Sequence, residues 1–221
     1  FCLSRGLGDV YKRQTLGDLY TNSDLVYNDD GYIEVDKNGN VAVKDDYMDD
    51  IYLGSVFPKY NLAWRNDFNY KGINLGVLFT ARIGGICYSA TQANMDLYGV
   101  SEASAAARDA GGVMINGRDM IDAQKWYQVI GSQSGLPQYY TYSATNVRLQ
   151  ELSLGYTLPS KWFRDKMRMT VSFVGRNLWM IYCKAPFDPE AVASTGMNYQ
   201  GIDYFMMPSM RNLGFNVKFQ F

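Results

Sequence analysis

The last twelve residues, Met210–Phe221, constrain the fold more than any other part of the chain. From Phe215 onward every second residue is a large apolar one, and polar residues stand between them. This alternation places the apolar side chains on one face of a β-strand. A soluble protein usually leaves its last residues polar and frayed. An apolar strand face and a terminal aromatic residue are instead typical of the closing strand of a transmembrane barrel.

The composition favours strands and excludes several classes of protein. Among 221 residues there are 18 Tyr, 11 Phe and 4 Trp, residue types that favour strands and membrane interfaces. No run of 18 apolar residues occurs, which excludes a transmembrane helix. The formal net charge is −1 and there is no basic block, so we predict no nucleic-acid partner.

The sequence offers no constellation for catalysis or for a cofactor. It contains no His, which removes the commonest general base and metal ligand. Cys2, Cys87 and Cys183 form no CxxC pair, so a zinc site is not expected, and a Cys87–Cys183 disulfide stays open. We therefore predict no enzyme activity, no cofactor and no metal.

One short segment has calcium-like spacing, Asp36-x-Asn38-x-Asn40. However, Gly39 stands at the fourth loop position, whereas an EF-hand needs glycine at the sixth, and Tyr47 stands where the closing Glu should be. The flanking stretches 32–35 and 41–43 are strand-like. We therefore predict a hairpin with an Asn-Gly turn.

The first fourteen residues look foreign to the rest of the chain. The stretch Ser4–Gln14 back-translates into a string that resembles a transposase-type sequencing adapter. Our hypothesis is that residues 1–14 are a translated assembly artefact, which fold reasoning should exclude. Residues 15–221 are then the part of the chain that belongs to the protein.

Five strands are predicted, at about 60–70, 73–83, 146–158, 168–182 and 210–221. In the third strand Val147 and Leu149 share one parity, whereas Leu152 and Leu154 share the other, so we predict a β-bulge near Gln150-Glu151. The predicted fold class is all-β. It is an antiparallel transmembrane β-barrel fragment, a curved open sheet with long extracellular loops that carry short helices.

The connections between these strands are of two kinds. Residues 71–72 and 159–166 are short links, whereas 84–145 and 182–208 are long ones. Successive strands cross the membrane in opposite directions. If the C-terminus is periplasmic, every short link therefore lies in the periplasm and every long link lies outside, which is the pattern of outer-membrane barrels. The segment 15–58 is then also extracellular. Within 84–145 we predict two helices, Ser101–Arg108 and Asp119–Ile130.

Charged and aromatic residues in the strands and loops follow from this topology. Arg82, Arg148 and Arg176 should face the lumen or lie near an interface, because a charge facing lipid costs about 2–4 kcal/mol at the midplane. Trp179 and Tyr182 fit an interfacial aromatic belt. Asp188 and Glu190 fit a solvated or cation-binding loop better than the paired carboxylates of a glycosidase.

Several phrases of the sequence resemble one family, the SusC/RagA-type TonB-dependent outer-membrane transporters. Residues 146–159 resemble its "YVRLRELSLGYTLP" strand, 174–179 its "GRNLF" strand and 187–190 its "DPE" loop. The stretches 97–101 and 111–113 resemble its "YGVS…GGV" loop. The residues that match the three motifs first named are Arg148, Leu149, Glu151, Leu152, Gly155, Tyr156, Pro159, Gly175, Arg176, Asn177, Leu178, Asp188, Pro189 and Glu190.

The resemblance implies a nutrient importer in the cell outer membrane. The chain would supply the last five strands of a 22-stranded barrel, and the plug and TonB box would lie upstream. The implied partners are a SusD-like surface lipoprotein, the TonB energy-transducing complex, outer-membrane lipid and a glycan or peptide substrate. The terminal residues Gly214, Phe215, Val217, Phe219 and Phe221 would form the signal for barrel assembly.

Two other classes of protein stay compatible with the strand pattern. A siderophore-type barrel receptor has the same periodicity, and only the family phrases separate it. A soluble β-sandwich that binds carbohydrate also has one apolar face per strand, which it buries against a second sheet. The loop asymmetry and the terminal aromatic residue count against the sandwich. The residues that contact substrate are not identified by the sequence.

Overall fold

The computed structural model describes residues 17–45, 51–132, 135–163, 167–193 and 201–220. The proposed adapter artefact, residues 1–14, lies outside these ranges. The chain forms two compact units. Unit 1 comprises Phe1–Phe57, Ile86–Tyr142 and Val192–Met206, and unit 2 comprises Pro58–Gly85, Ser143–Ala191 and Met207–Phe221. The three pieces of unit 1 therefore lie within the segments 15–58, 84–145 and 182–208 that were expected to be long loops, together with the first residues of the chain.

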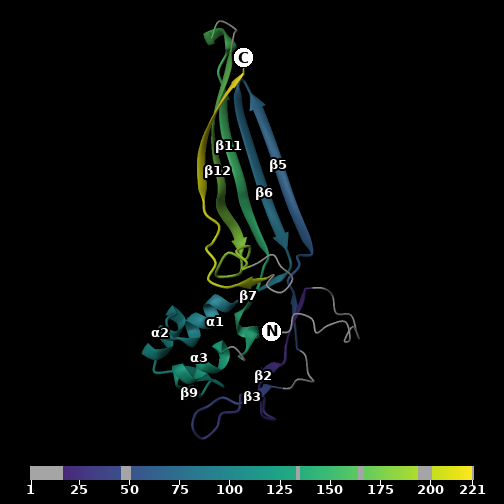
Figure 1. The fold of residues 1–221 in the computed structure, drawn as a ribbon. Coiled ribbons are helices and arrows are strands. Elements are labelled where there is room, and N and C mark those ends of the chain that lie inside the picture. Colours follow the sequence, from purple (N-terminus) through teal and green to yellow (C-terminus); the bar gives the residue numbers. More distant parts are fainter. Residues whose placement is uncertain (1–16, 46–50, 133–134, 164–166, 194–200, 221) are drawn as a thin grey trace. The chain divides into compact units, whose positions relative to one another are not determined.

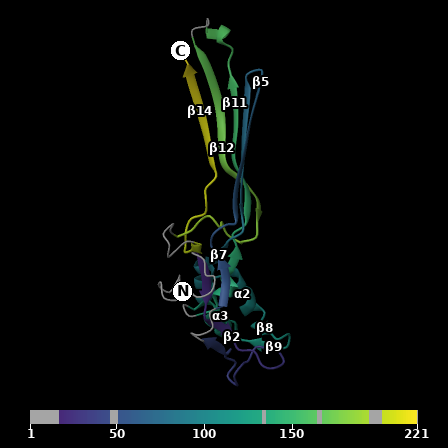
Figure 2. The ribbon, with the colours of Figure 1, turned by 90° about the vertical axis from the view of Figure 1, so that its right-hand side faces the viewer.

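Unit 2 is an antiparallel five-stranded sheet in the order β14-β12-β11-β6-β5 (Figures 1 and 2). Its strands are β5 Tyr60–Tyr70, β6 Ile73–Ile83, β11 Asn146–Thr157, β12 Arg168–Cys183 and β14 Asn212–Gln220. The strand ends differ from the expected ones by at most two residues. Among the described residues β5 and β14 each pair on one side alone, so the sheet is open at both edges and does not close into a barrel.

Local backbone geometry in unit 2 follows from particular residues. Lys71 and Gly72 both have positive φ, +48° and +88°, as a two-residue hairpin turn between β5 and β6 requires. The ladder of β11 shifts register between Leu149 and Glu151 against both β6 and β12. The shift is the bulge expected at Gln150. It keeps Val147, Leu149, Leu152 and Leu154 on one face despite their change of parity.

Unit 1 is built from short elements. Its helices are α1 Ala90–Leu97, α2 Glu102–Asp109 and α3 Ala123–Gly131, with a 3-10 turn η1 Pro137–Tyr140. The strands form pairs β1-β4, β2-β3 and β8-β9 and a three-stranded sheet β10-β7-β13. Their bounds are β1 Asp18–Thr21, β2 Ser23–Leu25, β3 Val43–Asp45, β4 Ile51–Ser55, β7 Ile86–Ser89, β8 Val113–Ile115, β9 Asp119–Ile121, β10 Thr141–Ser143 and β13 Ile202–Asp203. No helix in the described part of the chain is long and apolar enough to cross a membrane.

Unit 1 has a hydrophobic core of its own. Residues from distant parts of the sequence are buried together, and these are Leu25, Val41, Ala93, Ile115, Ile121, Trp126, Ile130, Leu136 and Tyr140. Trp126 and Ile130 point inward from α3, where their spacing of four places them on one helix face. The long connections are therefore folded structure rather than bare loops.

The prediction of a helix over Asp119–Ile130 is wrong for its first residues. Asp119–Ile121 is strand β9, which pairs with β8 through Val113–Ile121 and Met114–Met120. The helix begins only at Ala123, because the Asp122 carboxylate accepts hydrogen bonds from the backbone N–H groups of Gln124 and Lys125 and caps it. The helix capped by Ser101 is present as α2, whereas α1 was not expected.

We expect the chain alone to be insoluble in water. Its sheet has two open edges, and such edges with an exposed apolar surface drive aggregation. Size-exclusion chromatography with light scattering should show aggregates in buffer that detergent disperses. A monodisperse monomer that melts cooperatively without detergent would contradict this reading of the sheet.

Candidate functional site

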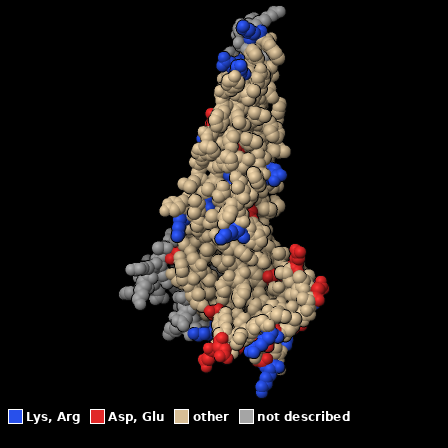
Figure 3. All heavy atoms as spheres, turned by 180° about the vertical axis from the view of Figure 1, so that it is seen from behind, with Lys and Arg blue, Asp and Glu red and all other residues tan. Residues whose placement is uncertain are grey.

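One face of the unit 2 sheet is predominantly apolar, and Asn66 is a polar exception on it. Residues paired across neighbouring strands form rows, and the central row contains one apolar residue from each strand: Phe68, Leu75, Leu154, Phe173 and Phe215. All of these except Leu75 expose half or more of their surface. Charged atoms are sparse over the strands in the view of Figure 3. Such an exposed face is suited to contact with lipid.

Aromatic residues flank this apolar band. Tyr70 on β5 and Tyr156 on β11 lie in one row, on either side of Ile73 on β6. Six residues earlier on β5, Trp64 stacks on Phe79 with ring centroids 5.7 Å apart, and the same row continues to Trp179. Six residues span about 20 Å of strand, close to the roughly 25 Å apolar band of outer-membrane barrels. Trp179 is exposed, as an interfacial belt needs.

The opposite face of the sheet is polar and carries an ion-pair network. The Glu151 carboxylate on β11 accepts a hydrogen bond from Arg176 Nε on β12 at 3.0 Å and lies 3.8 Å from Arg65 Nη1 on β5. Arg65 also pairs with Asp67 at 2.9 Å. The bulge at Gln150 is what brings Glu151 to this face. Arg176 therefore lies on the polar face, as expected from the cost of placing its charge against lipid.

Arg148 is the most buried charged side chain among the described residues of unit 2, with an exposed fraction of 2%. Its Nη2 atom lies 3.0 Å from Asp188 Oδ1 and 3.3 Å from Glu190 Oε2. Its Nη1 atom donates to Asn177 Oδ1 and to Ser209 Oγ, each at 3.4 Å. One guanidinium thus joins β11, β12, the loop after β12 and the segment before β14.

Asp188 completes this arrangement, which we call the Arg148 cluster: Arg148, Asn177, Asp188, Glu190 and Ser209. Asp188 accepts hydrogen bonds from the backbone N–H groups of Glu190, at 3.1 Å, and Ser209, at 3.2 Å, and from the Ser209 hydroxyl. These donors satisfy a carboxylate that would be costly to bury with fewer partners. Three family phrases therefore meet at one point. Asp188 and Glu190 both bind the Arg148 guanidinium, and Asp188 is nearly buried whereas Glu190 is exposed.

Asn177 occupies an unusual backbone conformation. Its φ is +54°, a left-handed geometry that asparagine tolerates better than most residues. Its side chain accepts from Arg148 and donates from Nδ2 to the Met210 carbonyl at 3.4 Å. The glycine of the same phrase, Gly175, lies against the Leu178 side chain: a Cβ there would lie 2.7 Å from Leu178 Cδ2, so that side chain would have to shift.

The remaining residues of the matched motifs are structural parts of β11 and its end. Leu149, Leu152 and Tyr156 lie on the apolar face, Gly155 is buried opposite Ser172, and the Pro159 carbonyl accepts from Trp162 after the strand. In the proposed assembly signal, Gly214, Phe215, Val217 and Phe219 lie on the exposed edge strand β14. Phe221 lies outside the described residues. Leu178, Pro189 and the assembly role itself stay untested expectations.

The calcium-like segment is a hairpin turn. The Asp36 carboxylate accepts hydrogen bonds from the backbone N–H groups of Asn38 and Asn40 at 2.7 and 2.9 Å and from the Asn40 amide at 3.0 Å. These bonds, first of all that from the Asn40 backbone, hold the pKa of Asp36 below its ordinary value. In the part of the chain that is described, no group of three or more His, Cys, Asp or Glu could hold a metal ion, and Cys87 and Cys183 form no disulfide.

We expect Arg148→Met to destabilise the full-length receptor by about 3–5 kcal/mol, because it leaves a buried carboxylate without its cation. Arg176→Met is the matched control. It removes the same charge from an exposed pair, worth about 0–1 kcal/mol. Urea unfolding in detergent micelles measures both. Equal midpoint shifts would mean that the Arg148 cluster carries no special stability.

Known proteins resemble this chain in sequence and in fold. No family model matches it. It is 25% identical over 198 residues to "TonB-dependent receptor P3" of Formosa agariphila, an alignment that covers 85% of this chain and 19% of that receptor. The RagAB peptide importer in its open-open state is similar in fold, with a TM-score of 0.59 and 15% identity over 92% of this chain and 22% of that one. Its closed-closed state gives 0.56 and 17%, over 95% and 24%.

The chain thus spans about a fifth of the proteins it matches. Those proteins are a receptor and an importer, which agrees with the prediction that the chain is no enzyme. The chain is therefore similar in sequence to a TonB-dependent receptor and in fold to the RagAB importer, and three of its family-like phrases meet at Arg148.

Proposed function

We propose that the chain forms the C-terminal part of an outer-membrane nutrient importer. In this proposal it contributes the last five strands of a 22-stranded barrel, and β5 and β14 pair with strands that other parts of the receptor supply. The observation that carries the proposal is the difference between the two faces of one sheet. The rows through Phe68 and Tyr70 are apolar and exposed, whereas Arg65, Glu151 and Arg176 share the other face.

The two faces then have separate roles. The apolar face contacts outer-membrane lipid. Because the bilayer core offers no hydrogen-bond partners to the backbone, each strand must pair with a neighbouring strand on both sides. The polar face lines the lumen, where the Arg65–Glu151–Arg176 network meets water and passing substrate. This arrangement supports binding and translocation of a solute without bond chemistry.

The proposed topology places Phe221 and the short links in the periplasm. The three pieces of unit 1 are then extracellular, where they stand at the side from which substrate arrives. A SusD-like lipoprotein is the proposed partner at that side, because the fold neighbours are two-component RagAB assemblies. The TonB complex would act through upstream parts of the receptor. The substrate class is a glycan or a peptide.

The two rival classes are less well supported. A soluble β-sandwich would bury its apolar face against a second sheet, yet Phe68, Leu154 and Phe173 expose half or more of their surface. A siderophore receptor shares the barrel, but the ordered family phrases favour the SusC/RagA type over it.

The lipid-facing assignment is tested by two neighbouring residues of β5. Phe68→Arg in the full-length receptor should cost about 2–4 kcal/mol, because it places a charge opposite the acyl chains. Asn69→Arg, one residue along on the polar face, should be tolerated. The measurement is the amount of heat-modifiable, folded receptor in isolated outer membranes. Equal yields from both variants would contradict the assignment of faces.

Transport itself is tested in cells. A strain without the receptor, complemented with the full-length gene, should take up a fluorescent glycan or peptide only when TonB is intact. Uptake that persists without TonB, or that is the same without the receptor, would overturn the proposed function.

A further inference from the structure

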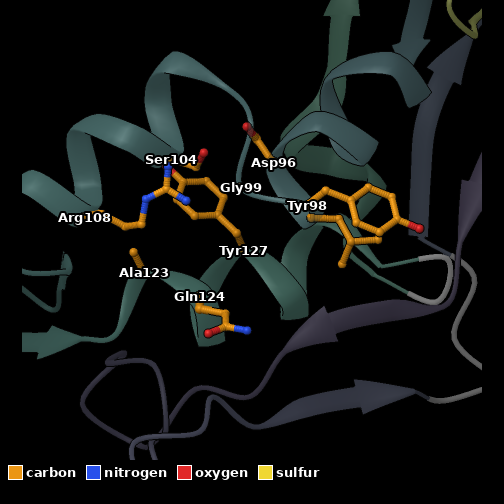
Figure 4. Close-up of a pocket in the computed structure, with 9 residues that line it drawn as sticks. Asp96, Tyr98, Gly99, Ser104, Arg108, Ala123, Gln124 and Tyr127 are labelled. Carbon is orange, nitrogen blue, oxygen red and sulfur yellow. The ribbon is translucent and has the colours of Figure 1, made fainter.

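Unit 1 contains a small pocket between its helices. The pocket has a volume of about 220 Å³ and lies where the end of α1, the helix α2 and the start of α3 come together (Figure 4). Its polar lining comprises Asp96, Ser104, Arg108, Gln124 and Tyr127. The volume is below the roughly 300 Å³ at which pockets for drug-sized ligands begin. The pocket therefore fits a ligand of one or two residues.

Asp96 is a buried carboxylate, with an exposed fraction of 3%. Its Oδ1 atom has no hydrogen-bond partner among the described residues, and the Tyr140 hydroxyl interacts with this side chain. Asp96 lies in the last turn of α1, where the helix carbonyls already concentrate negative charge. Burial and then the nearby charge of Asp96 raise the pKa of both Tyr127 and Tyr140. A carboxylate in such surroundings gains strongly from a cationic hydrogen-bond donor.

Arg108 supplies the opposite charge. It is exposed in the last turn of α2, and within the described ranges its guanidinium makes no hydrogen bond or ion pair. Its Nη1 atom lies 2.6 Å from the position that a Cβ at Gly99 would occupy, so glycine at this position leaves room for the guanidinium. Figure 4 shows Arg108 at one end of the pocket and Tyr98 toward the other, with Tyr127 and Asp96 between them in that view.

We propose that this pocket binds a small zwitterion, a free amino acid or a dipeptide, with its ammonium group at Asp96 and its carboxylate at Arg108. The ammonium donates to the buried carboxylate and neutralises it, and the guanidinium donates to the ligand carboxylate. The Tyr127 ring and the Gln124 amide provide an aromatic wall and a further polar contact. A neutral sugar could hydrogen-bond here, but it would leave both charges uncompensated.

The test is calorimetric titration of the purified full-length receptor with the dipeptide Ala-Ala. We expect saturable binding that weakens about tenfold or more, or 1.4 kcal/mol, for each of Asp96→Asn and Arg108→Gln. N-acetyl-Ala-Ala and Ala-Ala-amide should bind the unmodified receptor at least as weakly, since each lacks one charge. Maltose should not compete.

Asp109→Asn is the matched control. It removes a carboxylate at the exposed end of α2 that does not line the pocket, so it should bind Ala-Ala as the unmodified receptor does. The capped ligands decide the question even if Asp96→Asn fails to fold, because they need no variant. Absence of Ala-Ala binding, equal binding of the capped ligands, or displacement by maltose would overturn the proposal. Binding needs no transport, so its failure and a failure of uptake are separate results.

Discussion

The two-residue period of a β-strand is the constraint on which the structure of unit 2 depends. In lipid every backbone N–H and C=O must pair within the sheet. The two faces of a strand therefore differ only in the side chains that they carry. Five strands keep the same face apolar, and the row Phe68–Leu75–Leu154–Phe173–Phe215 shows how closely their registers agree. The bulge at Gln150 is essential to this agreement. Without it Val147 and Leu149 would lie on the face opposite to Leu152 and Leu154.

Charged residues in the sheet are placed where this constraint permits them. Arg65 and Arg176 pair with Asp67 and Glu151 on the polar face, where the two positive and two negative charges balance and the arginines remain accessible to water. Arg148 is different, because it is buried and must find its partners within the protein. Asp188, Glu190, Asn177 and Ser209 meet that need, and in doing so they hold the chain after β12 and before β14 against the strands. Three of the family phrases therefore contribute residues to one ion-pair cluster around the buried Arg148.

Unit 1 shows why long connections need not be irregular. Loops of more than about 15 residues without structure are uncommon in compact proteins, because their ordering must be offset by buried contacts. Here the pieces between the strands supply those contacts to one another, with Leu25 and Val41 from one piece packed with Trp126 and Ile130 from another. Their helices then create a pocket with separated charges.

The sequence by itself determined what depends on neighbouring residues: the five strands, the tight turn at Lys71-Gly72, the bulge, the hairpin at Asp36–Asn40 and the Ser101 cap. Each is set by local periodicity or by a side chain that bonds to its own backbone. Only the tertiary structure decided that Asp119–Ile121 pairs as a strand, that three segments form one unit, and that Arg148 meets Asp188 and Ser209. Those contacts join residues tens of positions apart. The partners of a buried charge such as Arg148 come together only when the chain folds, so no local sequence pattern predicts them.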